Sequence, residues 1–203
     1  DLAVEIDIDY ERIYLSDDSP VKIDKIFDPK SLMKPSNYLP PKLLLPDNYP
    51  QQKLRVACIM DEFSFNSYRD EFELLNLSLA TWESELEQFN PDFFFLESAW
   101  KGKDFEWEHK INRLDQELLE VLNWFRTNNI PIIFWNKEDP VHFNTFLSAA
   151  NQCDYIFTTD IDCINEYKKK LSHHNIYLLP FAANLNQTNP IISSKRNEGA
   201  CFA

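Results

Sequence analysis

Five short, largely apolar runs recur through the larger, C-terminal part of this sequence. They span residues 54–60, 91–97, 130–135, 154–158 and 176–179. A run that is apolar at consecutive positions is typical of a strand buried on both faces, as in a parallel sheet. Amphipathic stripes at helical spacing lie between the runs, within residues 111–125, 143–150 and 161–171. Residues 69–88 are also predicted to be helical, in one piece or two.

This alternation of strands and helices predicts an α/β fold. Because crossovers between parallel strands are right-handed, we expect a Rossmann-like, doubly wound parallel sheet over residues 53–199. Residues 1–28 are interpreted as a short β-rich appendage, the tail of a preceding domain, and residues 29–52 as a Pro-rich linker. Residues 200–203 resemble the opening strand of a further domain. We therefore interpret the chain as part of a longer protein.

The composition excludes several classes of protein. A net charge of −13 argues against binding to nucleic acid or, by charge alone, to anionic lipid. Only two residues are glycine, Gly102 and Gly199, so neither a phosphate-binding P-loop nor a dinucleotide fingerprint can be present. We accordingly expect that this domain binds no cofactor.

The four cysteines form no CxxC pair and have no histidine at zinc spacing. Three of them lie in or beside apolar runs and are interpreted as small core residues. Without a disulfide framework, the cysteines indicate a reducing compartment, which predicts a cytoplasmic protein. Attachment to the inner face of the membrane is left open. No apolar stretch approaches the roughly 18 residues of a membrane span, so we expect none.

Polar residues follow four of the five predicted strands, and in a parallel sheet the positions after the strands meet at one edge, where ligands bind. The mixture of carboxylates, hydroxyls, amides and aromatic rings there suits a hydroxyl-rich ligand such as a sugar. The candidate catalytic carboxylates are Glu138, Asp61 and Glu97. The candidate substrate-binding residues are Ser98, Trp100, Asn136, Lys137, Asp139, His142, Thr159, Asp160 and Phe181. No group of residues has the pattern of a metal site.

Several of these residues also have a purely structural interpretation. Asp139, which precedes Pro140, and Asp160 can each serve as a helix N-cap. Lys137 can neutralise Glu138 or Glu97. His142 can lie on the surface or cap a helix, whereas Trp100 and Trp107 can either cover a cleft or pack on the sheet.

A series of motifs resembles the CgeB-like family of bacterial glycosyltransferases. The motifs are FWNKEDPVHF at 134–143, DYIFTTD at 154–160 and LPFA at 179–182, with ESAW at 97–100 and Asn189-Pro190 in keeping with them. The resemblance covers residues 53–203. It implies a GT-B architecture of two Rossmann-like domains, in which the N-terminal domain holds the acceptor and the C-terminal domain binds the nucleotide-sugar.

The resemblance further implies decoration of cell-surface or spore polysaccharides, usually without a bound divalent metal. Asp160-Ile161-Asp162 has the spelling of a metal-binding Asp-x-Asp motif, but we interpret it as helix capping. The expected partners are a glycan or other hydroxyl acceptor and a C-terminal donor-binding domain of the same chain. A non-catalytic module that binds a glycan or a partner domain is the alternative. A receiver-like domain is a weaker one. It needs a phosphoacceptor Asp after the third strand and a Lys near the end of the fifth, and the clusters Asn-Lys-Glu-Asp at 136–139 and Pro-Phe-Ala at 180–182 do not match that pattern.

Overall fold

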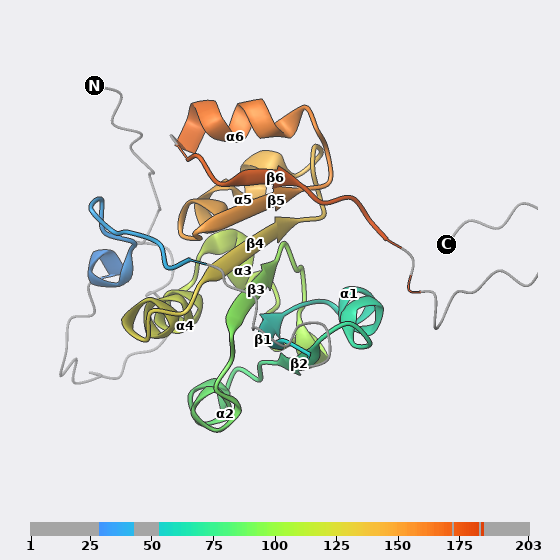
Figure 1. The fold of residues 1–203 in the computed structure, drawn as a ribbon. Coiled ribbons are helices and arrows are strands. Elements are labelled where there is room, and N and C mark those ends of the chain that lie inside the picture. Colours follow the sequence, from blue (N-terminus) through green and yellow to red (C-terminus); the bar gives the residue numbers. More distant parts are fainter. Residues whose placement is uncertain (1–28, 43–52, 172, 183, 185–203) are drawn as a thin grey trace, which may run out of the picture.

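The computed structural model describes residues 29–42, 53–171, 173–182 and 184 (Figure 1). The predicted β-rich appendage, part of the predicted linker, and residues 200–203 lie outside these residues. None of the helices in the described part of the chain is long and apolar enough to cross a membrane.

Six strands form one parallel sheet, which confirms the predicted fold class. The strands are β1 (Arg55–Ile59), β2 (Glu73–Asn76), β3 (Phe93–Glu97), β4 (Ile132–Asn136), β5 (Tyr155–Thr158) and β6 (Ile176–Leu178). Their order is β2-β1-β3-β4-β5-β6, and every neighbouring pair is parallel. The chain therefore runs outward from β1 in one direction to β2 and in the other direction to β3 and beyond.

Helices connect the strands on both faces of the sheet. They are α1 (Glu62–Tyr68), α2 (Trp82–Phe89), α3 (Lys110–Arg113), α4 (Gln116–Thr127), α5 (Phe143–Asn151) and α6 (Cys163–Leu171), with 3-10 turns η2 (Pro29–Leu32) and η3 (Lys103–Phe105). Apolar residues of α2 to α6 pack on one face of the sheet, where the rings of Phe94 and Phe125 stack with centroids 4.4 Å apart. Phe65 and Tyr68 of α1 pack on the other face, together with Leu179. The sheet is thus doubly wound.

Two parts of the secondary structure differ from the prediction. Residues 69–88 do not form a helix throughout, because residues 73–76 form the edge strand β2 and only the part from Trp82 is helical. β2 is exposed or half-buried along its whole length, so it lacks the continuous apolar run that identified the other strands. Residues 62–64, expected in a loop after β1, instead open helix α1.

The predicted stripe at 111–125 is divided between two helices. Leu114 adopts a left-handed backbone conformation with φ of 55°, which ends α3 before α4 begins at Gln116. Both helices still contribute buried residues to the same face of the sheet, Ile111 from α3 and Leu118 from α4. The apolar pattern was therefore a correct guide to burial, although the helix is broken.

Residues 29–42, the described part of the predicted linker, lie against the domain. Arg126 Nη1 of α4 donates to the Leu32 carbonyl at 2.8 Å, and Lys34 Nζ donates to the Cys153 carbonyl at 2.7 Å. The Tyr155 hydroxyl donates to the carbonyl of Pro41 at 3.1 Å. These bonds hold the segment beside α4 and the beginning of β5.

The central packing predicts a contrast between two Phe→Ala substitutions. Phe125 is fully buried, so Phe125→Ala should lower the free energy of unfolding by about 3–5 kcal/mol through lost burial and the cavity left behind. Phe105 is 60% exposed, so Phe105→Ala should cost less than about 1 kcal/mol. Chemical denaturation of both variants measures the difference; equal losses would contradict the packing described.

Candidate functional site

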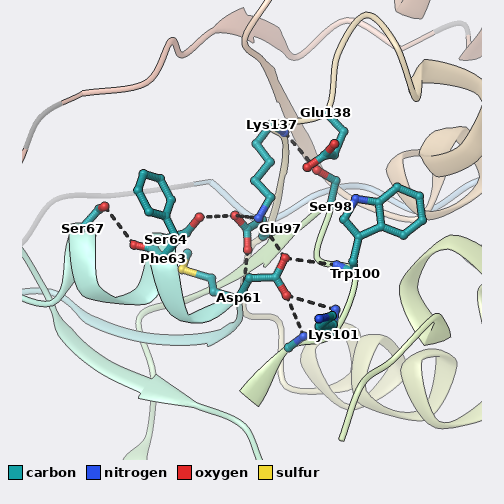
Figure 2. A network of polar contacts seen from close by, with 12 residues as sticks. Asp61, Phe63, Ser64, Ser67, Glu97, Ser98, Trp100, Lys101, Lys137 and Glu138 are labelled. Atoms are coloured by element: carbon teal, nitrogen blue, oxygen red, sulfur yellow. Dashed lines mark hydrogen bonds and ion pairs between the residues drawn. The ribbon is translucent and has the colours of Figure 1, made fainter. Parts of the chain in front are cut away.

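From β1 the chain adds strands on both sides, β2 on one and β3 on the other, so the topological switch point lies between β1 and β3. The carboxyl ends of β1, β3 and β4 form the candidate site (Figure 2). In open parallel sheets such a switch point is where ligands bind. Asp61 follows β1, Glu97 is the last residue of β3, and Lys137 comes directly after β4. The three charged groups meet there, as predicted from the strand ends.

Glu97 is the buried centre of this network. Its side chain is 0% exposed, and its Oε1 accepts hydrogen bonds from Lys137 Nζ at 3.0 Å and from the Ser64 hydroxyl. Its Oε2 accepts from the backbone N–H of Asp61 at 2.7 Å. Burial raises the pKa of Glu97, and the attraction of Lys137 with these hydrogen bonds only partly offsets that effect.

Asp61 joins the network to the loop that follows β3. Its Oδ1 accepts from the backbone N–H groups of Gly102 at 2.8 Å and Lys101 at 3.0 Å. Its Oδ2 accepts from Lys137 Nζ at 2.9 Å and from the Trp100 N–H at 3.2 Å. Burial alone would raise the pKa of Asp61, but the contact with Lys137 and the backbone donors hold it below its ordinary value.

This loop requires glycine at position 102. Gly102 has a φ of +65°, and a Cβ atom there would lie 2.7 Å from the Cβ of Trp107. Trp107 itself is fully buried and donates from Nε1 to the Leu77 carbonyl at 2.8 Å. Of the two interpretations of Trp107, packing is therefore correct. The close approach lets the loop turn its N–H groups toward Asp61.

Among the described residues, Lys137 is the cation that pairs with both carboxylates. Burial would lower its pKa, but Glu97 and Asp61 together raise it, so the ammonium stays charged. Its backbone N–H also donates to the Ser98 hydroxyl at 3.0 Å. Of the two candidate partners predicted for Lys137, the structure pairs it with Glu97, and it adds Asp61.

A second network lies beside the first, beyond β4. Asp139 accepts hydrogen bonds from Asn136 Nδ2 at 2.7 Å, from the Thr158 hydroxyl at 2.6 Å and from the Tyr167 hydroxyl at 3.1 Å. Burial raises the pKa of Asp139 to about 6 despite the Thr158 and Tyr167 hydroxyls. The alternative of Asp139 as a helix N-cap is wrong, because α5 begins only at Phe143 and the carboxylate points to these partners instead.

Two further candidates have structural contacts at this edge. The Thr159 hydroxyl donates to the carbonyls of Asn136 at 3.4 Å and Asp139 at 3.3 Å. Asp160 Oδ1 accepts from the N–H of Asp162 at 2.9 Å, just before α6 begins, which agrees with the capping interpretation. Both residues thus shape the loop between β5 and α6.

Glu138, Trp100 and His142 form the open part of the site. Among the described residues, the carboxylate of Glu138 has no hydrogen-bond or ion-pair partner, although its backbone N–H donates to Asn136 Oδ1 at 3.1 Å. The ring of Trp100 packs edge-on against His142 with centroids 5.0 Å apart and against Phe146 at 5.1 Å. His142 occupies the position before α5, but its side chain makes no capping hydrogen bond.

Sequence reasoning missed three residues of these networks. Ser64 lies on the unpredicted helix α1, Thr158 was assigned to a buried strand, and Tyr167 lies in the middle of α6. No local pattern marks them, because their partners are 33, 19 and 28 residues away in the chain. Phe181 lies farther along this edge, where it is 55% exposed and its ring packs on Trp135 at 5.3 Å.

Neither metal binding nor likeness to known proteins adds to this description. The described part of the chain contains no group of three or more His, Cys, Asp or Glu residues that could hold a metal ion. Comparison with known protein families, curated proteins and solved structures finds no match. The class that the fold and site define is therefore a Rossmann-like α/β domain with a polar site at its topological switch point.

The ion pairs of Lys137 with Asp61 and Glu97 predict that Lys137 contributes strongly to the stability of the fold. Lys137→Met leaves Asp61 and Glu97 adjacent and without a cation, which should lower the free energy of unfolding by about 3–5 kcal/mol at neutral pH. Lys169→Met removes an ammonium paired with Glu166 on the surface, at 70% side-chain exposure, and should have little effect. Denaturant titration compares them; a mild loss for Lys137→Met would mean that the network does not stabilise the fold.

Asp139 predicts a specific dependence of stability on pH. Because its folded-state pKa of about 6 lies above the ordinary 3.8, its contribution is complete below pH 3.8 and is lost as the pH rises through 6. Asparagine cannot ionise, so the stability of wild type relative to Asp139→Asn should fall by about 1–2 kcal/mol between pH 4 and pH 7, since solvent around the half-buried carboxylate screens part of the effect.

Denaturation curves at a series of pH values measure that difference. Asp162→Asn, which changes an exposed aspartate outside the Asp139 network, is the matched control. A pH-independent difference between wild type and Asp139→Asn would show that Asp139 ionises as freely in the folded protein as in the unfolded chain.

Proposed function

We propose that this chain is the acceptor-side domain of a bacterial GT-B glycosyltransferase of the hexosyltransferase type. It would help to transfer a sugar from a nucleotide-sugar to a glycan or other hydroxyl acceptor in cell-surface polysaccharide biosynthesis. The proposal rests on the CgeB-like motifs, several of which fall at one edge of the sheet, after β3, β4 and β5. A cytoplasmic location belongs to the proposal, supported by the free, buried cysteines Cys58, Cys153 and Cys163.

The observation that carries the proposed chemistry is the unengaged carboxylate of Glu138 at this edge. Of the three candidate carboxylates, Asp61 and Glu97 already accept hydrogen bonds from Lys137, Ser64 and backbone N–H groups. Accepting a proton there would break the ion pairs that hold the site together. Glu138 is therefore the residue best suited to orient and deprotonate an acceptor hydroxyl.

In this mechanism the acceptor oxygen attacks the anomeric carbon of the donor while its proton passes to Glu138. The bond between the sugar and the nucleotide diphosphate breaks, and the diphosphate leaves with the bonding electrons. A second domain would meet the charge of the diphosphate with basic residues and helix N-termini. The half-buried ring of Trp100, with His142 against it, would offer an apolar surface beside Glu138 for a sugar ring.

The alternative is a module that binds a glycan or a partner domain without chemistry. The full internal pairing of Asp61 and Glu97 favours this alternative, because a structural network needs no substrate. A receiver-like phosphoacceptor is less well supported. When β2 is counted, the third strand along the chain is β3, and it ends in Glu97, where a receiver would have its aspartate. Glu97 is a glutamate with no exposed surface, and the fifth strand, β5, is followed by Thr159 and Asp160 and not by a lysine.

Glu138→Gln tests the enzymatic proposal. In the protein that carries both domains, this change should lower turnover about 100-fold or more, because the amide cannot accept the acceptor proton. Glu87→Gln, an exposed substitution on α2, is the matched control and should leave turnover unchanged. The measurement is transfer from a panel of UDP- and GDP-hexoses to glycan acceptors.

Wild-type turnover by Glu138→Gln would remove this residue from the mechanism. Absence of transfer by the wild type with every donor, together with retained binding of a glycan, would support the binding module instead.

A further inference from the structure

A pocket of about 150 Å³ lies beside the network, between helix α1 and the segment that follows β6. Trp135 Nε1 donates to the Leu179 carbonyl at 2.9 Å and fixes the beginning of that segment. Asn184 Nδ2 donates to the Ser67 carbonyl at 3.1 Å and to Asp70 Oδ2 at 3.0 Å, so the segment is also attached to the end of α1. The pocket is therefore framed by contacts at both ends.

Aromatic rings form most of the wall. Phe63 and Tyr68 line it from α1, Trp135 from β4, and Phe181 from the segment after β6. The rings of Phe63 and Phe181 are 69% and 55% exposed, so their faces are available to a ligand. Tyr68 and Trp135 pack edge to face at 5.7 Å and make a fixed floor. Flat, exposed rings are suited to the apolar C–H face of a sugar ring.

The polar groups of the lining are neutral or acidic. The hydroxyl of Tyr68 has no hydrogen-bond partner among the described residues. Burial, and to a smaller extent the nearby charge of Glu97, raises the pKa of Tyr68 to about 12, so the hydroxyl keeps its proton and can donate a hydrogen bond. Ser67 Oγ donates to the Phe63 carbonyl and keeps its lone pairs as acceptors. Glu71 adds a carboxylate at the rim. Among the described residues that line the pocket there is no Lys, Arg or His, so none of them would neutralise a phosphate.

The size of the pocket restricts its ligand further. Pockets that hold drug-sized molecules enclose about 300 Å³ or more, so a pocket half that size accommodates one ring and not a nucleotide-sugar. Ser64 belongs both to the lining and to the Glu97 network, where its hydroxyl donates to Glu97. A ring held here would therefore lie against the same switch point as the proposed catalytic edge (Figure 2).

We propose that this aromatic pocket binds one neutral sugar ring of the acceptor. This inference rests on the proposed glycosyltransferase function and assigns a place for an acceptor unit, with Phe181 as a stacking surface and Tyr68 as a hydroxyl donor. It predicts selectivity for uncharged glycosides over nucleotides and sugar phosphates.

The experiment follows the indole N–H signal of Trp135 in the 203-residue chain, labelled with ¹⁵N and assigned with a Trp135→Phe variant. The probes are a panel of neutral methyl hexosides. UMP and glucose 6-phosphate represent phosphate-bearing ligands, and tetramethylammonium represents cations. At least one methyl hexoside should shift the signal in a saturable way, and the phosphates should not. Phe181→Ala should weaken that binding about tenfold or more, because the stacking surface is lost.

Tyr68→Phe keeps the packed ring and removes only the hydroxyl, so it should weaken binding several-fold without unfolding the protein. Phe105→Ala, also an exposed phenylalanine but outside the pocket, should leave the affinity within twofold. The panel overturns the proposal if no hexoside shifts Trp135, if Phe181→Ala binds as tightly as wild type, or if tetramethylammonium or a phosphate binds in place of the hexosides.

These results separate the pocket from the catalytic proposal. If transfer depends on Glu138 while Trp135 senses no hexoside, the pocket assignment fails and the glycosyltransferase function stands. If hexosides bind in the pocket and Phe181→Ala weakens them, but no donor supports transfer, the pocket assignment stands and the function is binding alone.

Discussion

The contact of Lys137 with Glu97 and Asp61 holds together the edge of the sheet on which this protein's site is built. Glu97 ends a central strand and has no access to water, so its negative charge needs a nearby cation and several hydrogen bonds. Lys137, directly after the neighbouring strand β4, supplies the cation. On the other side of Glu97, the backbone of Asp61, just after β1, and the hydroxyl of Ser64 in α1 supply hydrogen bonds. The ends of β1, β3 and β4 are thereby fixed relative to one another.

The rest of the site follows from that arrangement. Asp61 turns its remaining oxygen lone pairs to the loop of residues 100–102, which places Trp100 beside His142. Ser64, bound to Glu97, positions α1 and with it one wall of the aromatic pocket. Because these charged groups already satisfy one another, the proposed chemistry is assigned to Glu138, whose carboxylate has no partner among the described residues. Asp61 and Glu97, which are candidates by residue type, are engaged in contacts that hold the network together.

The acidic network beyond β4 has a different character. Among the described residues, Asp139 accepts hydrogen bonds from the neutral donors Asn136, Thr158 and Tyr167 and from no cation. Burial raises its pKa, and these donors offset that effect only in part, whereas Lys137 and backbone N–H groups hold the pKa of Asp61 below its ordinary value. Two aspartates at one edge of the same sheet thus differ in charge behaviour because an ammonium offsets the burial of only one of them.

The sequence by itself determined the class of fold and the edge that carries the polar residues. Continuous apolar runs identify strands buried on both faces, and parallel strands bring the residues after them to one side. It could not reveal β2, because this edge strand has a polar residue at each end, Glu73 and Asn76, and therefore no such run. Nor could it reveal which carboxylates are engaged. Lys137 lies 76 residues from Asp61 along the chain, and only the crossovers of the tertiary structure bring the two within 2.9 Å. Local patterns report burial and secondary structure, whereas ion pairing depends on contacts between distant segments.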